Sequence, residues 1–407
     1  MNILIITQHY PPEIGAASNR MKNLSYFLNK LGHKVTVLTS EPTYPNKEIY
    51  KKKDHNELKG LENIKVYRVN TFLESYSRNK VKRLILYISF IFSGIYKLLK
   101  IKEKFDLIII TSPPIFVGIL GIIAKLRYKC KLYLDIRDLW PDSVKALEIF
   151  QNKTLLNIAY RFEKFLYNKS DKLIINSTAF KEMLLKKGQT ESDIIYLPNG
   201  IANEFINRIS YIEKDDNFVR VIYAGNLGYA QGLEALIETA KLLKDYKKIK
   251  ISVIGGGVEL EKLISLSKKY DLKNIEFLGV LPREKVVEEL LKSHIGIIHL
   301  SNRKIFETVI PSKVFDYMVT KLPIVAGVRG EIARLLLESG CALICDPYDS
   351  KKMSEYILQL ALDKDLREKK GENGYTYLLK HFVWDKNIKE LDFKIKNISN
   401  KEGMELK

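Results

Sequence analysis

The fold is most constrained by a unit that recurs along the chain: a short apolar run, a loop of glycine or polar residues, and a stretch of helical periodicity. The first copy joins residues 3–7 to apolar residues spaced as on one helix face, namely Met21, Leu24 and Leu28. Strands that alternate with helices in this way predict parallel sheets with crossover helices. The chain is therefore expected to be an α/β protein.

The unit occurs in two series, separated by the turn Pro198-Asn199-Gly200 and by polar residues 211–217. A length of 407 residues suits two domains of about 200 residues each. We predict two Rossmann-like, doubly wound domains, residues 1–202 and 203–373, with a helix at 374–392 that crosses back to the first. The predicted strands are residues 3–7, 35–38, 107–110, 131–134 and 173–175, then 220–224, 251–254, 275–278, 295–299 and 324–326.

Charge is divided unevenly between the two halves of the chain. The net charge is +19, and residues 1–200 contain 33 basic and 18 acidic side chains, whereas the remainder contains 34 and 30. This excess predicts a surface that faces nucleic acid, anionic lipid or an anionic substrate, although a general bias toward lysine is an alternative. No recognisable DNA- or RNA-binding motif accompanies the charge, which argues against a nucleic-acid partner.

Cysteine usage and the first residues bear on location. Cys130, Cys341 and Cys345 have neither the spacing of a zinc site nor a histidine cluster, so we expect no metal site and a reducing compartment. Residues 1–7 lead into an apolar strand without a basic region, unlike a signal peptide. The expected location is the cytoplasm.

One apolar segment, residues 84–95, is flanked by Lys80, Lys82 and Arg83 on one side and by Lys97 and Lys100 on the other. It is shorter than the roughly 18–20 residues that span a bilayer. A helix lying at an anionic membrane surface and a buried crossover helix both fit this pattern.

In open α/β sheets, ligands bind beside the loops that follow the strands. Gly225, Asn226, Gly228 and Gln231 lie in such a loop, and Gly255 lies in the next. Glycines permit close backbone approach, and the amides of the following helix can bind a phosphate. A turn without a ligand is the alternative, and no Walker motif is present.

A second loop, around residues 306–318, carries charged side chains. Pro311 and Ser312 predict a helix start that places Lys313 in the first turn and Asp316 one turn later on the same face. A cation at a helix start suits a diphosphate, and the carboxylate can accept both hydroxyls of a ribose. The alternative is a plain capped helix with a surface Lys-Asp pair.

Taken together, these stretches resemble glycosyltransferase family 4, and most closely its bacterial capsule and O-antigen enzymes that transfer N-acetylated amino sugars. The resemblance implies a GT-B fold with two Rossmann-like domains facing a central cleft, retention of anomeric configuration, and no cofactor or obligatory metal. The nucleotide would bind the second domain and the acceptor the first. The resemblance rests on His9-Tyr10-Pro11-Pro12-Glu13-Ile14-Gly15, Asp135-Ile136-Arg137-Asp138-Leu139-Trp140-Pro141, Pro198-Asn199-Gly200, residues 225–232, Pro311-Ser312-Lys313 and Asp316-Tyr317-Met318.

The resemblance also implies roles for single residues. Asp316 would hold the ribose and Lys313 the diphosphate, while backbone amides of residues 306–310 would reach the donor sugar. Glu307 lies nine residues before Asp316, where the family's acidic pair is eight apart, so its contact with the sugar stays open. The implied donor site comprises Gly15, Gly225, Asn226, Gly228, Gln231, Gly255, Glu307, Thr308, Val309, Ile310, Pro311, Ser312, Lys313, Asp316 and Arg329.

The charge that neutralises the diphosphate is expected from Lys313 or Arg329, because Asn226 and Gln231 replace the basic residues often found in the family's loop. His9, Glu13, Arg137 and Asp138 on first-domain loops would orient the acceptor or touch the donor sugar, and with Lys313 they form the expected catalytic set. A structural Arg137–Asp138 ion pair is the alternative. Retaining enzymes of this kind let the leaving phosphate deprotonate the acceptor, so no carboxylate nucleophile is expected.

The expected activity is retaining transfer of an N-acetylated amino sugar from a UDP-sugar to a polyprenyl-diphosphate-linked saccharide. The enzyme would act peripherally at the inner face of the plasma membrane, on an anionic surface. The alternatives are a UDP-sugar epimerase of similar shape, which would need acid-base carboxylates on both sides of the sugar, and a non-enzymatic nucleic-acid-binding protein. Donor identity, linkage and oligomeric state stay open.

Overall fold

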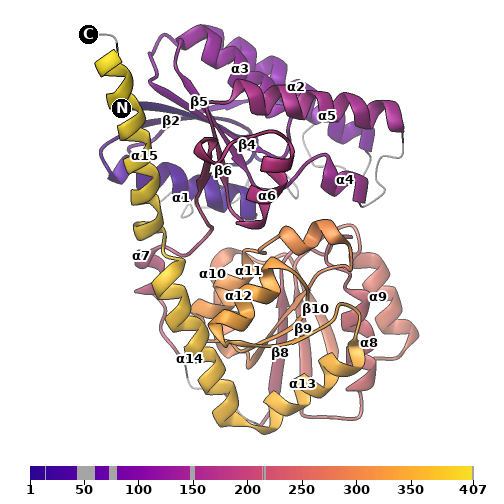
Figure 1. The fold of residues 1–407 in the computed structure, drawn as a ribbon. Coiled ribbons are helices and arrows are strands. Elements are labelled where there is room, and N and C mark those ends of the chain that lie inside the picture. Colours follow the sequence, from indigo (N-terminus) through magenta and orange to yellow (C-terminus); the bar gives the residue numbers. More distant parts are fainter. Residues whose placement is uncertain are drawn as a thin grey trace. The chain divides into compact units, whose positions relative to one another are not determined.

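The computed structural model describes residues 1–13, 15–43, 60–72, 80–146, 152–212, 214 and 217–405, and it divides into two compact units (Figure 1). Unit 1 comprises Met1–Asn199 and Trp384–Lys407, and unit 2 comprises Gly200–Val383. The first boundary therefore lies before the predicted one at residue 202, and the chain returns to unit 1 after the predicted residue 374.

Unit 1 is built on a seven-stranded parallel sheet with the order β3-β2-β1-β4-β5-β6-β7. Its central strands are apolar almost throughout, as expected of strands that are buried on both faces. The edge strands β3 and β7 were not predicted, because charged residues interrupt the apolar residues of β3 and β7 has only 3 residues. The strands are β1 (Asn2–Ile6), β2 (Lys34–Ser40), β3 (Lys65–Val69), β4 (Leu107–Ser112), β5 (Lys131–Ile136), β6 (Lys172–Ile175) and β7 (Ile194–Tyr196).

Helices cover both faces of this sheet, with α1 and α15 on one side and α2, α3 and α5 on the other (Figure 1). The helices of unit 1 are α1 (Ala16–Lys30), α2 (Lys80–Lys100), α3 (Val117–Tyr128), α4 (Asp142–Ala146), α5 (Lys153–Lys169), α6 (Ala179–Lys186) and α15 (Trp384–Glu405).

Unit 2 repeats the plan with a six-stranded parallel sheet in the order β10-β9-β8-β11-β12-β13. Its strands are β8 (Val219–Ala224), β9 (Ile249–Ile254), β10 (Ile275–Gly279), β11 (Ile295–His299), β12 (Ile324–Gly327) and β13 (Ala342–Cys345), of which β13 was not predicted. Its helices are α7 (Asn203–Ile206), α8 (Glu234–Leu242), α9 (Leu260–Lys269), α10 (Arg283–Lys292), α11 (Lys313–Val319), α12 (Glu331–Ser339), α13 (Ser350–Leu362) and α14 (Lys364–His381).

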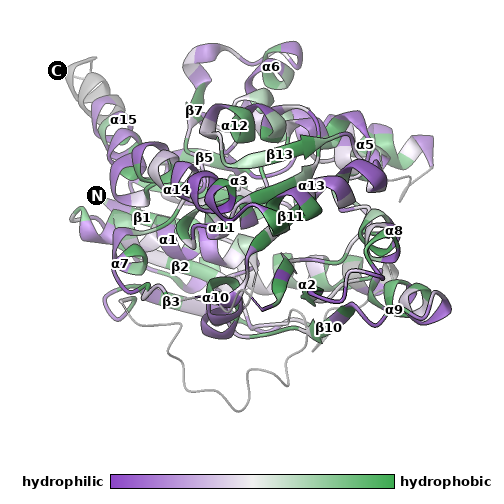
Figure 2. Cartoon of the chain, turned by 90° about the horizontal axis from the view of Figure 1, so that it is seen from below, coloured by the Kyte–Doolittle hydropathy of each residue, from purple (hydrophilic) through white to green (hydrophobic). Residues whose placement is uncertain are grey.

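Both units are doubly wound, so each has a point where the strand order reverses. This point lies between β1 and β4 in unit 1 and between β8 and β11 in unit 2. Figure 2 shows that strands β1 and β11 are largely hydrophobic, whereas helix α10 is hydrophilic. Ligands bind at the carboxyl ends of the strands near such points, so the loops after these strands position the candidate site.

The predicted helix at 374–392 is two helices. The α14 helix ends at His381 and α15 begins at Trp384. Between them Val383 forms a parallel bridge with Ile201, and the amide of Ile201 donates to the carbonyl of Phe382. Because these residues pair as extended backbone, the helix is interrupted there. The α15 helix then packs on α1, where Trp384 stacks on Phe27.

The α2 helix is longer than the apolar segment that predicted it, with 21 residues. One of its faces is buried through Leu86, Phe90, Ile91 and Leu98, so it is a crossover helix. A second face leaves large apolar side chains exposed. One face of α2 is therefore buried against the unit, as in a crossover helix, and another is open to the surface. The exposed stripe comprises Leu84, Ile85, Ile88, Phe92, Tyr96 and Leu99. Within the described residues, no helix combines the length and the apolar character needed to cross a membrane.

Candidate active site

The glycine loops after β8 and β9 touch each other backbone to backbone. A Cβ atom on Gly255 would lie 1.8 Å from the carbonyl oxygen of Gly225, and one on Gly257 would lie 2.3 Å from that of Leu227. Both residues have positive φ, which glycine adopts at little cost. The close packing of the two loops therefore accounts for a glycine at position 255. The predicted contact of Gly255 with the donor is not needed to explain why the residue is glycine.

Lys313, the first residue of α11, lies against the other side of the Gly225 loop. Its Nζ is 3.5 Å from the ring centroid of Tyr223. A Cβ atom on Gly225 would lie 2.9 Å from the same Nζ, so glycine at this position leaves room for the amine. Within the described part of the chain, the amine has no hydrogen-bond or ion-pair partner. Burial lowers the pKa of the Lys313 amine well below its usual range, although the charge of Asp316 opposes this shift.

Two tyrosines hold the place where Lys313 lies. The Tyr317 hydroxyl accepts a bond of 2.9 Å from the amide of Ala224 and donates to the carbonyl of Ile297, which ties α11 to β8 and β11 at the reversal of strand order. The Tyr223 hydroxyl donates to the carbonyl of Asn226 at 2.7 Å and so holds the glycine loop. The amine thus lies on the ring of Tyr223, whose position is held by a hydrogen bond to the glycine loop.

Asp316 has a charged partner that the sequence did not predict. Arg283, the first residue of α10, donates from Nη1 to Oδ2 of Asp316 at 2.9 Å and from Nη2 to Oδ1. The guanidinium also lies over the ring of Phe205, 5.0 Å from its centroid. Each carboxylate oxygen keeps a further lone pair, so Asp316 can still accept a bond from a ligand hydroxyl.

Asn226 and Gln231 stabilise their own turn. The Gln231 Oε1 accepts from the amide of Gly228 at 3.1 Å and from the Asn226 side chain at 3.5 Å. Neither side chain brings a positive charge. The carbonyl of Gln231 accepts from Nδ1 of His299 at 2.7 Å, and Nε2 of His299 accepts from the amide of Tyr348 at 3.0 Å.

The loop after β11 begins helix α11 as predicted. Residues Lys304–Thr308 form a 3₁₀ helix, Val309 is extended, and α11 starts at Lys313 with Ser312 before it. Ile310 is buried, whereas Glu307, Thr308, Pro311 and Ser312 are partly exposed. The carbonyl of Glu307 packs against Gly330, where a Cβ atom would lie 2.2 Å away.

Arg329 is already paired. Its Nε donates to Oδ1 of Asp346 at 2.8 Å, and its Nη1 donates to Oδ1 of Asn302 at 3.3 Å. Lys313 is therefore the better placed of the two cations that we expected to meet a diphosphate.

In unit 1, the loop after β1 holds His9 and Glu13 together. His9 Nδ1 is 2.9 Å from Glu13 Oε2, and Glu13 Oε1 accepts from the amide of Thr43 at 3.2 Å. Glu13 is buried, while His9 keeps part of its ring exposed. Glu13 therefore orients His9 and ties the loop to the end of β2. Ile14 lies outside the described residues, and Gly15 precedes α1 with φ of 153°.

A buried ion pair joins three distant parts of unit 1. Arg20 on α1 contacts both oxygens of Asp135 at the end of β5, and each side chain is almost completely buried. Arg20 also donates to Oδ1 of Asn199 at 2.8 Å and to the carbonyl of Leu197 at 3.0 Å. Arg20 was not predicted as a site residue, because only the fold brings it beside Asp135.

Arg137 continues this network and, among the described residues, forms no ion pair with Asp138, which was the alternative to a role at the site. Its Nε donates to Oγ1 of Thr111 at 2.8 Å and its Nη2 to the carbonyl of Pro113, while Thr111 donates to Asp135. Burial lowers the pKa of Arg137 to about 10. Burial raises the pKa of Asp138, although a hydrogen bond from Ser143 and the charge of Arg137 oppose the shift.

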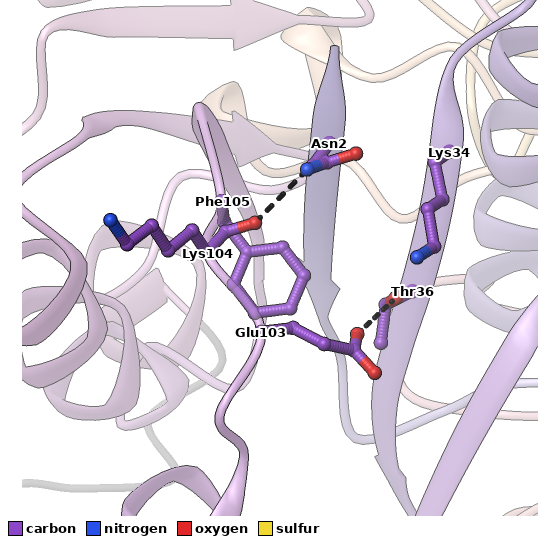
Figure 3. Close-up of a pocket in the computed structure, with 6 residues that line it drawn as sticks. All are labelled: Asn2, Lys34, Thr36, Glu103, Lys104 and Phe105. Atoms are coloured by element: carbon purple, nitrogen blue, oxygen red, sulfur yellow. Dashed lines mark hydrogen bonds between the residues drawn. The ribbon is translucent and has the colours of Figure 1, made fainter.

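A separate cavity of about 230 Å³ lies at the opposite end of the unit 1 sheet (Figure 3). It opens at the amino ends of β1 and β2, with Asn2, Lys34 and Thr36 on one side and Glu103, Lys104 and Phe105 on the other. Because the predicted site residues follow the carboxyl ends of the strands, this cavity is not part of the candidate active site.

Two family models divide the chain between them. Residues 17–205 match the model of glycosyltransferase family 4, and residues 204–377 match that of glycosyl transferases group 1. The chain is a glycosyltransferase of family 4 type. Its two units have the GT-B fold: it superposes on sucrose-phosphate synthase from Thermosynechococcus elongatus with a TM-score of 0.79, at 14% identity over 98% of this chain and 99% of that one.

Other similar proteins cover most of the glycosyltransferase. An uncharacterized glycosyltransferase of Methanocaldococcus jannaschii is 26% identical over 96% of this chain and 97% of the relative. A putative colanic acid biosynthesis glycosyl transferase of Escherichia coli K12 is 26% identical over 78% and 81%. The structure of HepE from Anabaena in complex with UDP-glucose has a TM-score of 0.72, at 15% identity over 98% and 100%. Neither the epimerase nor the nucleic-acid-binding alternative is favoured by these matches.

In this glycosyltransferase, the structure brings Gly225, Lys313 and Asp316 to one end of the unit 2 sheet, as the spacing predicted. It brings His9, Glu13, Arg137 and Asp138 to the corresponding end of the unit 1 sheet. Sequence reasoning missed Arg283, Tyr223 and His299 in unit 2. Tyr223 and His299 each lie near the end of a buried strand, and this position is the signal that could have found them.

Proposed function

We propose that this glycosyltransferase moves an N-acetylated amino sugar, with retention, from a UDP-sugar to a polyprenyl-diphosphate-linked saccharide during synthesis of a surface polysaccharide. The observation that carries the donor half of the proposal is the position of Lys313. Lys313 is only partly exposed, its amine has no ion-pair partner within the described residues, and it lies against a glycine loop at the reversal of strand order in unit 2. An anion bound there gains the positive charge of the amine.

Burial explains how the site discriminates between charged and neutral ligands. The low dielectric around Lys313 disfavours its protonated form in the free enzyme, and a diphosphate restores that form by bringing negative charge nearby. The same charge then stabilises the diphosphate as it leaves the sugar. A lysine in this role supplies the positive charge that a metal supplies in other transferases, so we propose that no metal is required.

The likeness to HepE, whose structure contains UDP-glucose, favours a uridine nucleotide as donor. The likeness to the E. coli colanic acid protein favours a polysaccharide role. The amino-sugar class and retention rest on the resemblance of the motifs around Asp135 and Pro311. In a front-face reaction, the leaving phosphate takes the acceptor proton, and His9 and Asp138 orient the acceptor hydroxyl.

The acceptor half of the proposal rests on unit 1. The α2 helix presents an exposed apolar stripe and contains no acidic residue. Such a helix buries its apolar face among lipids while its cations meet anionic headgroups. We propose that the enzyme works peripherally on the anionic inner face of the plasma membrane, where a lipid-linked acceptor is exposed.

Calorimetry of UDP binding tests the donor half. In two buffers of different ionisation enthalpy, at a pH above the lowered pKa of the Lys313 amine, the wild-type enzyme should take up a proton when UDP binds, because the diphosphate favours the charged amine. Lys313→Ala should abolish this proton uptake. UDP binding without proton uptake, or unchanged uptake in the variant, would contradict the assignment of Lys313.

Activity assays test the rest. Transfer from UDP-sugars in the presence of a lipid-linked saccharide should exceed hydrolysis without it and should persist in EDTA. Interconversion of two UDP-sugars without an acceptor would support the epimerase alternative, and salt-sensitive retention on DNA would support the nucleic-acid alternative.

A further inference from the structure

Four aromatic side chains from separate elements meet in unit 1 around Phe116. The ring centroid of Phe116 is 6.3 Å from that of Tyr87 on α2, 6.5 Å from that of Phe162 on α5 and 5.8 Å from that of Trp140 after β5. None of the four is fully buried. We call these four residues the aromatic cluster. Large aromatic rings that remain partly exposed together mark a surface that can bind an apolar ligand.

The aromatic cluster lies beside the polar residues of the unit 1 site. Phe116 belongs to the loop after β4, and Trp140 belongs to the loop after β5. Arg137 joins these two loops, because it donates to Thr111 and to the carbonyl of Pro113. The amide of Trp140 donates to the carbonyl of Asp138 at 3.1 Å. An apolar group on the cluster would therefore be attached close to the place where the acceptor is expected.

The aromatic cluster is continuous with the exposed stripe of α2. Leu84 precedes Tyr87 by three residues, a spacing that places both side chains on the same side of a helix. Leu84, Ile88 and Phe92 are 43%, 40% and 64% exposed. An apolar path thus runs from the polar site past Tyr87 to the open surface of the helix.

The charges of the helices around this apolar path indicate which kind of ligand can bind there. Helices α2, α3 and α5 together carry eleven lysines and arginines and a single acidic residue, Glu163. Glu163 is buried and pairs with Lys187 at 2.6 Å. The helices around the apolar path therefore complement an amphiphile with an anionic head, not a neutral or cationic one.

We propose that the aromatic cluster binds the polyprenyl chain of the lipid-diphosphate acceptor, next to the diphosphate that links the chain to the sugar. This inference rests on the proposed function and adds the site at which the chain is held. The chain would enter along the α2 stripe and lie on Phe116 and Trp140. The phosphates would remain near Arg137, whose charge the neighbouring network already positions.

Trp140 supplies a built-in reporter for the test. The chain has two tryptophans, and the other, Trp384, is 1% exposed. Titration of the full-length protein with farnesyl diphosphate, below its aggregation concentration, should give a saturable blue shift of tryptophan emission. Inorganic diphosphate, which lacks the chain, should give no shift. The response should disappear in Trp140→Phe, which keeps an aromatic ring but removes the reporter.

A matched pair of variants locates the binding surface. Phe116→Ala should weaken farnesyl diphosphate binding about tenfold, since a lost aromatic contact with an apolar ligand is worth on the order of one decade. Leu126→Ala removes an exposed apolar side chain from α3, the helix that follows Phe116, at a position outside the aromatic cluster. This variant should bind farnesyl diphosphate like the wild type. If Phe116→Ala unfolds at a lower temperature than wild type, Phe116→Leu replaces it and should still weaken binding.

With farnesyl diphosphate alone, either the absence of a saturable shift or equal affinity in Phe116→Ala and wild type would overturn the inference. A shift with anionic vesicles but none with monomeric farnesyl diphosphate would also overturn it, because the cluster would then face the bilayer itself. UDP binding to unit 2, measured in the same samples, separates these failures from failure of the proposed function. Intact UDP binding with no chain binding would refute only this inference.

Discussion

Lys313 illustrates how a single side chain obtains its chemistry from its surroundings. The amine lies on the ring of Tyr223, opposite a glycine that leaves it space. The ring face attracts the charged form of the amine, whereas burial opposes it, and the lowered pKa indicates that burial dominates in the free enzyme. A ligand with two or more negative charges reverses this balance.

We therefore expect Lys313→Ala to lower turnover about 10²-fold or more, since it removes the charge that stabilises the leaving diphosphate. Steady-state kinetics with a soluble acceptor analogue measures this effect. Lys268→Ala, which removes an exposed lysine of α9, is the matched control and should keep wild-type turnover. Near-native turnover in Lys313→Ala would transfer the role to backbone amides or to Arg329.

Asp316 is expected to bind the ribose while Arg283 holds its carboxylate in place. Asp316→Ala should weaken UDP binding by about 1–3 kcal/mol, because ribose hydroxyls would lose a charged acceptor. Calorimetry with UDP and with 2′,3′-dideoxy-UDP measures the effect. The dideoxy compound should bind both proteins equally, and a loss of equal size for both ligands would show that Asp316 does not contact the ribose.

At the scale of elements, His299 joins two loops of unit 2. It donates to the carbonyl after β8 and accepts from the amide of Tyr348 after β13, which requires a neutral ring. Burial lowers the pKa of His299 below the ordinary value of 6.5. As the pH falls below 6.5, His299 becomes protonated in the unfolded chain but stays neutral in the folded chain. The free energy of unfolding therefore decreases until the pH reaches the lower pKa of the folded state.

Urea unfolding at pH 7.5 and pH 5.5 tests this expectation. The wild-type protein should lose more stability between the two pH values than His299→Gln, which has no titrating ring. Equal losses in the two proteins would mean that His299 is protonated equally in the folded and unfolded states.

The α2 helix should carry binding to anionic vesicles through two separable contributions. Each Lys or Arg near an anionic surface contributes about 1 kcal/mol, a contribution that salt screens, whereas burial of apolar side chains resists salt. Ile91 is buried, so the exposed side chains of Phe92 and Tyr96 are expected to supply the apolar contribution. The side chains of Lys80 and Arg83 lie outside the described residues.

Flotation with liposomes at low and high salt separates the two contributions. Replacement of Lys82, Lys97 and Lys100 with Gln should reduce binding at low salt, while Phe92→Ser with Tyr96→Ser should remove the salt-resistant part. Donor hydrolysis should stay intact in both variants. A wild-type protein that ignores anionic vesicles at low salt would show that the stripe meets another partner.

At the scale of the whole molecule, the Arg20–Asp135 pair links residues 115 apart, and Arg20–Asn199 links residues 179 apart. Removing one partner of a buried ion pair leaves the other charge uncompensated, which costs about 3–5 kcal/mol. Arg20→Ala should therefore lower the free energy of unfolding by this amount. The double replacement Arg20→Met with Asp135→Leu should cost much less, and denaturant unfolding of the three variants compares them. Equal destabilisation by single and double replacements would mean that packing, not charge, dominates.

The sequence by itself determined the doubly wound architecture, because buried parallel strands must be apolar throughout and the intervening helices must keep one apolar face. It also determined that Lys313 and Asp316 share a helix face, since this depends only on local spacing. Edge strands β7 and β13 escaped prediction because they have only 3 and 4 residues, and β3 escaped it because Lys65 and Arg68 interrupt its apolar residues.

Only the tertiary structure decided which distant side chains meet. Arg283 reaches Asp316, Arg20 reaches Asp135, and Phe116 gathers three rings, all because crossover connections bring strand ends together. Periodicity describes one element at a time, so it cannot rank pairings between elements. For the same reason, the buried and exposed faces of α2 could not be told apart from the sequence. Hydropathy shows that a residue is apolar but not whether another element covers it.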